Sequence, residues 1–402
     1  MRIGLDLRWL EQVYALSSTG GLGGAGVYSR NLWLGLARSF PDIELVALVS
    51  RKRDLPEPLL RLIRAAPKHI IFPFGLEGLI PAWYHRGKHR LALHLVESEL
   101  GFFAGLARLR LDVLHLLDFT VAAPRRVPSP IIATVYDLYG WNAVAQGRDL
   151  YGALERYRFL RTIKRCQVLV AISDFTQNDL QRCFPERKGP FPVVRCGIEV
   201  EDFKMAREGN RESLRQRFDL SGSYFLHVGV LLERKNPAGL IKAMGKVVHT
   251  GHAEVRLVCV GPYQAFPATR ERVVRLAQEQ EIESAVQIIG DVCEEDLACL
   301  YQNALGLIFP SFGEGYGIPA VECLASGTPC VVSKAGALPE AVGPYGILVD
   351  PSNPEDIASG MLRLLEDQTY RRMIAVQGPR WAQRFSLESM ARKYMELYQN
   401  LA

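Results

Sequence analysis

Short runs of β-branched and other apolar residues alternate with longer amphipathic stretches along most of this 402-residue chain. In the first half, the apolar runs lie at 2–7, 45–49, 113–117, 131–135 and 168–172. Such alternation is typical of βαβ units, in which a crossover helix returns the chain to a parallel sheet. The pattern therefore predicts a parallel sheet covered by helices in the first half of the chain.

The same alternation restarts after a polar stretch at 204–210. Strands are predicted at 224–228, 255–260, 286–289, 305–309 and 329–333, and helices between them at 237–248, 269–280, 294–303 and 319–326. From residue 354 the chain is predicted to be helical. Its last stretch, 387–401, repeats Met390, Tyr394, Leu397 and Tyr398 at helical spacing, which we interpret as core packing.

These elements predict an α/β protein of two Rossmann-like, doubly wound parallel-sheet domains that face each other across a cleft, with C-terminal helices. A chain of this length, 48% hydrophobic, is long enough for two cores. The predicted domains are 1–205 and 206–385, and a C-terminal helix at 386–402 is predicted to pack back across the domain junction. Ligands of such folds bind outside the carboxyl ends of the strands, so the motifs that follow strands are of most interest.

Composition narrows the class of protein. Asp6, Arg8 and Glu11 interrupt any apolar leader, and no stretch reaches about 18 uncharged apolar residues, which predicts a soluble, cytoplasmic protein. The eight cysteines form no CxxC pair and are interpreted as buried thiols.

Charge is unevenly distributed along the chain. Residues 1–200 hold 27 Lys+Arg against 18 Asp+Glu, and the remainder holds 21 against 25. The basic half suggests an anionic partner, with nucleic acid, a phosphorylated acceptor and a membrane surface all open. A solvated, Arg-rich surface is the alternative.

The most informative segment follows the strand predicted to end near residue 309. It reads Pro-Ser-Phe-Gly-Glu-Gly-Tyr-Gly-Ile-Pro and leads into a helix. Its glycines allow close approach of the backbone to a ligand, and the amides at the helix start favour an anion such as a diphosphate. Glu314 in the loop and Glu322, predicted on the first turn of the helix, can accept hydrogen bonds from sugar hydroxyls. The alternative for Glu322 is that it only complements the helix dipole.

The run SFGEGYGIPAVECLASGTPCVVSKAGALPEAVG resembles the donor-binding signature of retaining glycosyltransferases of family 4, which have the GT-B fold of two facing Rossmann-like domains. Glu314 and Glu322 match the Glu-x7-Glu motif of that family. The resemblance implies that Glu322 binds the ribose of the nucleotide and that Glu314 approaches the transferred sugar. It also places four further residues in the donor-binding loop: Gly315, Tyr316, Gly317 and Ile318.

A second segment, Glu-Arg-Lys-Asn-Pro at 233–237, follows the strand predicted at 224–228. Two adjacent cations at a strand end can neutralise a diphosphate leaving group. An ordinary exposed pair before a helix is the alternative. The segment resembles the Arg-Lys-Asn segment of the family, which implies that Arg234 and Lys235 bind the donor phosphates. Some members carry an arginine where Val230 stands here, so Arg234 and Lys235 are expected to carry more of the phosphate charge.

In the first domain, glycines 20, 21, 23, 24 and 26 precede a helical pattern. The spacing is too long for a dinucleotide fingerprint, which makes a dehydrogenase a poor second choice. The loop resembles the glycine-rich first loop of the family, which implies that Gly24 lies near the donor phosphates and the acceptor. A simple turn is the alternative.

The strand predicted at 131–135 ends in Tyr136-Asp137, where many family members have His-Asp. A tyrosine hydroxyl can exchange hydrogen bonds with a sugar but does not titrate near neutrality. Glu314, Asp137 and Tyr136 are therefore the catalytic candidates, with Asp137 as the ionisable group of its motif. Ser173 and Asp174 are interpreted as a helix cap and its neighbour.

The resemblance implies transfer of a hexose to an acceptor hydroxyl with retention, and without a metal or other cofactor. The motifs most resemble those of bacterial mannosyltransferases of lipopolysaccharide O-antigen or exopolysaccharide biosynthesis. GDP-mannose is therefore the first choice of donor, and UDP-glucose or another UDP-sugar the next. A catalytically silent nucleotide-sugar-binding protein is the alternative from another class.

The acceptor is expected to be a glycan or a polyprenyl-diphosphate-linked sugar. Peripheral contact with the anionic inner face of the cell membrane is predicted through residues 83–90, which are rich in basic and aromatic side chains. No nucleic acid partner is expected, because no known nucleic-acid-binding motif is recognisable.

Overall fold

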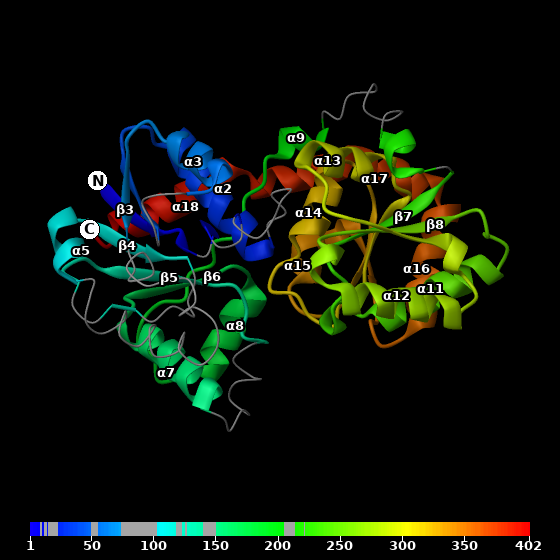
Figure 1. The fold of residues 1–402 in the computed structure, drawn as a ribbon, viewed down its shortest axis with the longest axis horizontal. Coiled ribbons are helices and arrows are strands. Elements are labelled where there is room, and N and C mark those ends of the chain that lie inside the picture. Colours follow the sequence, from blue (N-terminus) through cyan, green and yellow to red (C-terminus); the bar gives the residue numbers. More distant parts are fainter. Residues whose placement is uncertain are drawn as a thin grey trace. The chain divides into compact units, whose positions relative to one another are not determined.

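The computed structural model describes residues 1–8, 10–11, 14, 23–49, 55–73, 103–117, 123–124, 127–139, 150–204, 214–220 and 222–402 (Figure 1). The chain forms two compact units, one of residues 1–197 with 387–402 and one of residues 198–386. Each unit contains one six-stranded parallel sheet. The predicted α/β class with two Rossmann-like domains is confirmed.

In the first unit the sheet has the order β3-β2-β1-β4-β5-β6. Its strands are β1 (Arg2–Asp6), β2 (Glu44–Val49), β3 (His69–Pro73), β4 (Val113–Leu116), β5 (Ile131–Val135) and β6 (Val168–Ala171). Among the described residues of this unit, the helices include α2 (Gly24–Ser39), α3 (Glu57–Arg64), α5 (Phe103–Leu109), α7 (Leu150–Arg165), α8 (Asp174–Cys183) and α18 (Leu387–Gln399). The chain leaves the neighbouring strands β1 and β4 toward opposite edges, so the topological switch point lies between them.

In the second unit the sheet has the order β12-β11-β10-β7-β8-β9. Its strands are β7 (Tyr224–Val228), β8 (Arg256–Val260), β9 (Val286–Ile289), β10 (Gly306–Phe309), β11 (Cys330–Ser333) and β12 (Gly346–Val349). Its α-helices include α9 (Val200–Lys204), α11 (Pro237–His249), α12 (Pro267–Glu279), α13 (Glu294–Asn303), α14 (Ile318–Ala325), α15 (Leu338–Val342), α16 (Pro354–Glu366) and α17 (Gln368–Ala382). Single 3-10 turns lie at η4 (Glu233–Lys235), η5 (Tyr263–Ala265), η6 (Glu283–Ala285), η7 (Gly343–Tyr345) and η8 (Gln383–Phe385). Its switch point lies between β7 and β10.

The predicted strands agree with the observed ones to within a residue, because most of them are buried apolar runs with clear ends. The strands β3 and β12 were not predicted. Both lie at an edge of their sheet, and β12 is short and mostly only partly buried. Ser173 caps α8 as interpreted, since its Oγ accepts a hydrogen bond from the backbone N–H of Thr176 at 3.0 Å.

The units divide between Gly197 and Ile198, whereas the sequence placed the boundary after residue 205. The helix α9 belongs to the second unit because the ring of Phe203 packs edge-on against Tyr301, with centroids 6.0 Å apart. In addition, the side-chain amide of Gln302 donates to the carbonyl of Phe203 at 2.6 Å.

The C-terminal helix α18 belongs to the first unit, where it packs beside α2 (Figure 1). A Cβ on Gly35 of α2 would lie 2.7 Å from the carbonyl oxygen of Leu387. Glycine at this position therefore allows the two helices to approach closely. No helix among the described residues is long and apolar enough to cross a membrane.

The described residues include all eight cysteines, and none of them is in a disulfide. Six are buried as interpreted, but Cys183 is partly exposed and Cys293 is exposed.

Candidate functional site

The switch point of the second unit lies where β7 and β10 are neighbours. Ligands in open α/β sheets bind outside the carboxyl ends of the strands at this point. Residues 229–235 follow β7 and residues 310–317 follow β10. The topology therefore brings the Arg-Lys motif and the glycine-rich loop, which are far apart in sequence, to the same edge of one sheet.

Glu314 lies at the centre of this cluster. Its Oε2 accepts a hydrogen bond from Nη1 of Arg234 at 2.7 Å, and its Oε1 accepts one from Oγ of Ser311 at 3.0 Å. The same Oε1 lies 4.0 Å from Nζ of Lys235. Glu314 is only 9% exposed, whereas the Arg234 side chain is 48% exposed and accessible to a ligand. The sequence-predicted Glu314, Arg234 and Lys235 thus form one charged cluster.

Lys235 is buried against the end of β7. Its ammonium donates to the carbonyl of Val228 at 3.2 Å and lies 4.5 Å from the ring centroid of Phe309, a cation–π contact. Burial lowers the pKa of Lys235 to about 8; the nearby carboxylate of Glu314 opposes this shift and the charge of Arg234 adds to it. Lys235 is therefore a cation at neutral pH that holds its proton weakly.

Asn236 ties the loop after β7 to its neighbours. It has a left-handed backbone, with φ of 60°, and caps α11. Its Nδ2 donates to the carbonyls of Pro310, at 3.2 Å, and Pro351, at 2.6 Å. A backbone bond from Phe312 N–H to the Arg234 carbonyl, 2.8 Å long, joins the same two loops. These bonds fix the position of the cation pair relative to Glu314.

Glu322 does not lie on the first turn of its helix, and that prediction is wrong. The helix α14 begins at Ile318 after Gly317, which places Glu322 on the second turn, and the first turn holds no acidic residue. The Oε2 of Glu322 accepts a hydrogen bond from the buried hydroxyl of Tyr301 at 2.9 Å. Glu322 is therefore held by tertiary contacts and is not a helix cap.

The donor-loop residues Gly315, Tyr316, Gly317 and Ile318 are all buried. The ring of Tyr316 packs edge-on against Phe385, with centroids 6.0 Å apart. Gly317 has φ of 107°, and a Cβ there would lie 2.5 Å from Cδ2 of Leu338. Because the side chain of Tyr316 packs inside the unit, the backbone is the part of this segment best suited to contact a ligand.

In the first unit, Gly24 begins α2 and is exposed, whereas Gly20 and Gly21 lie outside the described residues. The helix has no side-chain cap at Gly23, whose φ is −63° and where a Cβ would meet nothing within 4 Å. Neither the conformation nor the surrounding protein atoms require glycine at position 23. An anion that approaches the amides of this helix start would be a physical reason for small residues there.

Tyr136 follows β5 and contacts the start of α2. Its hydroxyl lies 3.2 Å from Oγ of Ser29 and donates to the carbonyl of Ala25 at 3.4 Å. Asp137 accepts a hydrogen bond from the backbone N–H of Tyr139 at 3.1 Å, so it also organises its own turn. Gly24, Tyr136 and Asp137 thus gather within the first unit, and the other predicted site residues gather within the second.

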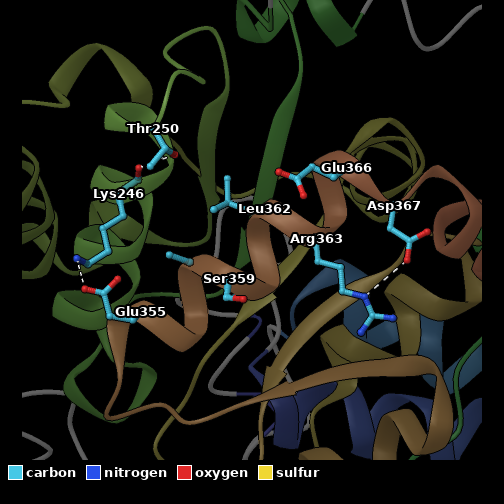
Figure 2. Close-up of a pocket in the computed structure, with 9 residues that line it drawn as sticks. Lys246, Thr250, Glu355, Ser359, Leu362, Arg363, Glu366 and Asp367 are labelled. Carbon is cyan, nitrogen blue, oxygen red and sulfur yellow. Dashed lines mark hydrogen bonds and ion pairs between the residues drawn. The ribbon is translucent and has the colours of Figure 1, made fainter.

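The described residues also form a shallow pocket of about 450 Å³ between α11 and α16 (Figure 2). Four of its charged side chains form ion pairs, Lys246 with Glu355 and Arg363 with Asp367 at 3.7 Å. None of the predicted site residues lines it. We therefore place the candidate site at the strand ends.

Sequence reasoning missed three residues that shape the site: Ser311, Tyr301 and Gly229. Gly229 has φ of 100°, and a Cβ there would lie 2.5 Å from Nζ of Lys235, so glycine makes room for the ammonium. A glycine directly after β7 and a serine soon after β10 were visible signals. Tyr301 had no such signal in the sequence, because its partner Glu322 is 21 residues away.

The fold and the charged cluster define an α/β protein with two cations and a carboxylate gathered at a sheet switch point. A family model described as Glycosyltransferase Family 4 matches residues 22–202, and one described as Glycosyl transferases group 1 matches residues 210–381. Together the two matches include every strand of both sheets except β1, and the chain belongs to the family 4 glycosyltransferases.

Three relatives illustrate the similarity. A D-inositol 3-phosphate glycosyltransferase of Corynebacterium urealyticum is 31% identical over 60% of this chain and 58% of that protein. The O-antigen chain mannosyltransferase B of Escherichia coli is 26% identical over 62% and 66%, so the chain spans less than two thirds of either protein. An MMP alpha-(1->4)-mannosyltransferase of Mycolicibacterium hassiacum is 27% identical over 94% of both chains.

Among solved structures, sucrose-phosphate synthase from Thermosynechococcus elongatus matches with a TM-score of 0.73 at 21% identity, covering 100% of this chain and 99% of that one. Anabaena HepE in complex with UDP-glucose matches with a TM-score of 0.71 at 17% identity and covers 100% of both chains. At these identities the likeness shows the fold alone, which is the GT-B fold.

Proposed function

We propose that this protein transfers a hexose, with mannose from GDP-mannose as the first choice, to a hydroxyl of a glycan or a polyprenyl-diphosphate-linked acceptor. The observation that carries the proposal is the cation pair Arg234 and Lys235 set against Glu314 at the switch point of the second sheet. A nucleotide-sugar supplies the diphosphate that such a pair can bind and a sugar that a carboxylate can bind.

In this proposal Arg234 and Lys235 bind the donor diphosphate, together with the amides at the start of α14. Arg234 is paired with Glu314 in the structure. A diphosphate would compete for the guanidinium and so make the carboxylate of Glu314 available to hydroxyls of the sugar. Glu322, held by Tyr301, is the proposed ribose ligand.

The reaction we propose retains the configuration at the anomeric carbon and requires no metal or other cofactor. The bond from the anomeric carbon to the diphosphate oxygen breaks, and a bond from that carbon to the acceptor oxygen forms. The leaving phosphate takes the acceptor proton, so no side chain need act as the base. Stabilisation of the departing charge by Arg234 and Lys235 is then the main catalytic contribution. Tyr136 and Asp137 would orient the acceptor or the sugar.

The choice of donor rests on the relatives' names. Two of them are mannosyltransferases, which favours GDP-mannose. HepE was solved with UDP-glucose, which favours a UDP-sugar as the second candidate. We propose that the reaction takes place in the cytoplasm, at the inner face of the membrane. The predicted membrane contact, residues 83–90, lies outside the described residues.

A thermal-shift panel of GDP, UDP, ADP and their sugars tests the donor. A ligand present at about 100 times its dissociation constant adds roughly 2.7 kcal/mol of stability, so the correct base should raise the melting temperature clearly above the others. We expect GDP and GDP-mannose to do so. A shift with UDP compounds alone would replace GDP-mannose by a UDP-sugar, and no shift with any nucleotide would contradict the proposal.

Turnover separates an enzyme from a silent nucleotide-sugar-binding protein. We expect slow release of nucleotide from the matching donor, unchanged by EDTA and reduced about 100-fold or more by Glu314→Ala, if that carboxylate stabilises the transition state. A bound donor that is never turned over would favour the silent protein. Loss of turnover with EDTA, restored by a divalent cation, would contradict metal independence.

A further inference from the structure

The helix α18 inserts two tyrosines, Tyr394 and Tyr398, into the core of the first unit. Both side chains are fully buried, and their rings stack with centroids 5.8 Å apart. A buried hydroxyl is costly unless it is hydrogen-bonded. The partners of these two hydroxyls therefore indicate what the helix holds in place.

The hydroxyls form one continuous chain of hydrogen bonds through α2, α18, β5 and β4. In order, the contacts are Val194 O with Tyr28 OH (2.9 Å), Tyr28 OH with Tyr394 OH (2.6 Å), Tyr394 OH with Thr134 Oγ1 (2.9 Å), Thr134 Oγ1 with His115 Nε2 (2.8 Å), and His115 Nδ1 with Tyr398 OH (2.7 Å).

The donor and acceptor of each hydrogen bond in this chain can be assigned by starting from the end at Val194. The carbonyl of Val194 can only accept, so the single hydroxyl proton of Tyr28 is used there. The oxygen of Tyr28 must then accept from Tyr394, and the oxygen of Tyr394 in turn from Thr134. The oxygen of Thr134 finally accepts from N–H at Nε2 of His115.

His115 completes the chain as a neutral ring. Burial lowers the pKa of His115 to about 3, so it carries one ring proton at neutral pH. With that proton on Nε2, its Nδ1 is an acceptor for the hydroxyl of Tyr398. Every hydroxyl in the chain therefore donates once, and the network has a single consistent arrangement.

Tyr394 is the member that joins the two elements of the first-unit site. Its hydroxyl bonds Tyr28 on α2 and Thr134 on β5. Two residues beyond Thr134 is Tyr136, whose ring packs edge-on against Tyr28 at 5.4 Å and whose hydroxyl lies 3.2 Å from Ser29. The end of β5 and the start of α2 are thus joined at Tyr136 and joined again at Tyr394.

We propose that Tyr394 is a positioning residue for sugar transfer: its hydroxyl fixes the end of β5 against α2 and so holds Tyr136 in place. The proposal rests on the glycosyltransferase function proposed above. Tyr394 acts from the core of the unit, through Thr134 and Tyr28, and is not itself expected to touch a substrate.

A pair of matched variants tests this role. Tyr394→Phe keeps the ring but removes the bonds to both α2 and β5, whereas Tyr398→Phe removes one bond, to His115 on β4. We expect Tyr394→Phe to lower kcat by roughly tenfold, because small misplacements of site groups are costly, and to leave the donor KM nearly unchanged. Tyr398→Phe should also lower the melting temperature, because it leaves a ring nitrogen of the buried His115 unpaired, but it should keep kcat within about twofold.

A double-mutant cycle gives the sharper readout. If Tyr394 acts through Tyr136, Tyr394→Phe should have little further effect on kcat in a Tyr136→Phe background. Three outcomes would each overturn the proposal. They are additive losses of kcat in the double variant, a Tyr136→Phe variant with wild-type kcat, and equal losses of kcat in Tyr394→Phe and Tyr398→Phe. A wild-type protein that turns over no donor would instead count against the proposed function, whereas an active wild type matched by a fully active Tyr394→Phe would overturn this inference alone.

Discussion

Lys235 lies where a positive charge is proposed to bind a diphosphate but where its burial is energetically costly. It is buried beside the cation Arg234, and its loss of water is offset in part by Glu314, 4.0 Å away, by the carbonyl of Val228 and by the ring of Phe309. A buried ammonium without enough compensation releases its proton more readily. The charge on which diphosphate binding is proposed to depend is therefore sensitive to pH just above neutrality.

This setting predicts a pH dependence of donor binding. The pKa of Lys235 is lowered to about 8, so the side chain is charged below that pH and loses its proton as the pH rises through it. We expect the donor dissociation constant to be flat from about pH 6.5 to 7.5 and to rise by up to about tenfold per pH unit above 8. Calorimetric titration across this range measures it.

The matched control is Lys235→Arg, because a guanidinium stays charged throughout this range. The donor dissociation constant of this variant should change little between pH 7 and 9, even if the variant binds the donor more weakly than the wild type does. A wild-type dissociation constant that is constant to pH 9.5 would contradict the role of Lys235.

At the scale of elements, the loop and helix after β10 are built around a glycine with left-handed backbone. Gly317 precedes α14 and packs under Leu338 of α15. The sequence predicted the helix correctly but began it one residue late, at Pro319, because proline at the first helical position is the more common signal. Because the helix begins at Ile318, Glu322 lies on its second turn and not on its first.

We expect Gly317→Ala to destabilise the second unit by about 1–3 kcal/mol, since the new Cβ combines a positive φ with a close contact to Leu338. Urea unfolding followed by tryptophan fluorescence measures the free energy. Gly23→Ala is the control, because a Cβ there meets nothing within 4 Å at φ of −63°; its stability should stay within about 1 kcal/mol of the wild type. Equal costs for both variants would show that the backbone of Gly317 is not special.

At the scale of the whole molecule, the chain builds the same strand order twice and then returns its last helix to the first unit. The cation pair, Glu314 and Glu322 all lie in the second unit, whereas α18 supplies core side chains to the first. The two units therefore differ in what they lose when the C-terminus is removed.

We expect a chain that ends at Ser386 to lose the fold of its first unit and keep that of its second. Each large buried side chain of α18 contributes about 2–5 kcal/mol, which together rivals the total stability of a domain. Hydrogen exchange should show lost protection in residues 1–197 and retained protection in 198–386, with the nucleotide-induced thermal shift preserved. A chain that ends at Gln399 is the control and should behave as the wild type does. Loss of protection throughout would contradict independent units.

The sequence by itself determined the two α/β units and the segments that form the candidate site. Both have local signals: apolar runs of strand length, and residues such as Arg234, Lys235 and Glu314 placed directly after strands. Parallel topology then brings strand ends to one edge, so the meeting of these three side chains was predictable in outline.

Only the tertiary structure decided how the side chains are held. Three features join residues from different elements. They are the hydrogen bond between Glu322 and Tyr301, the burial that lowers the pKa of Lys235, and the chain of hydroxyl hydrogen bonds from Val194 to Tyr398. In the sequence, the tyrosines of α18 show only helical spacing. That spacing is the same whether the rings merely pack in the core or their hydroxyls also form hydrogen bonds to other elements. Their hydroxyls acquire a role because folding brings α2, β4 and β5 around them, and contacts between distant segments leave no local pattern to read.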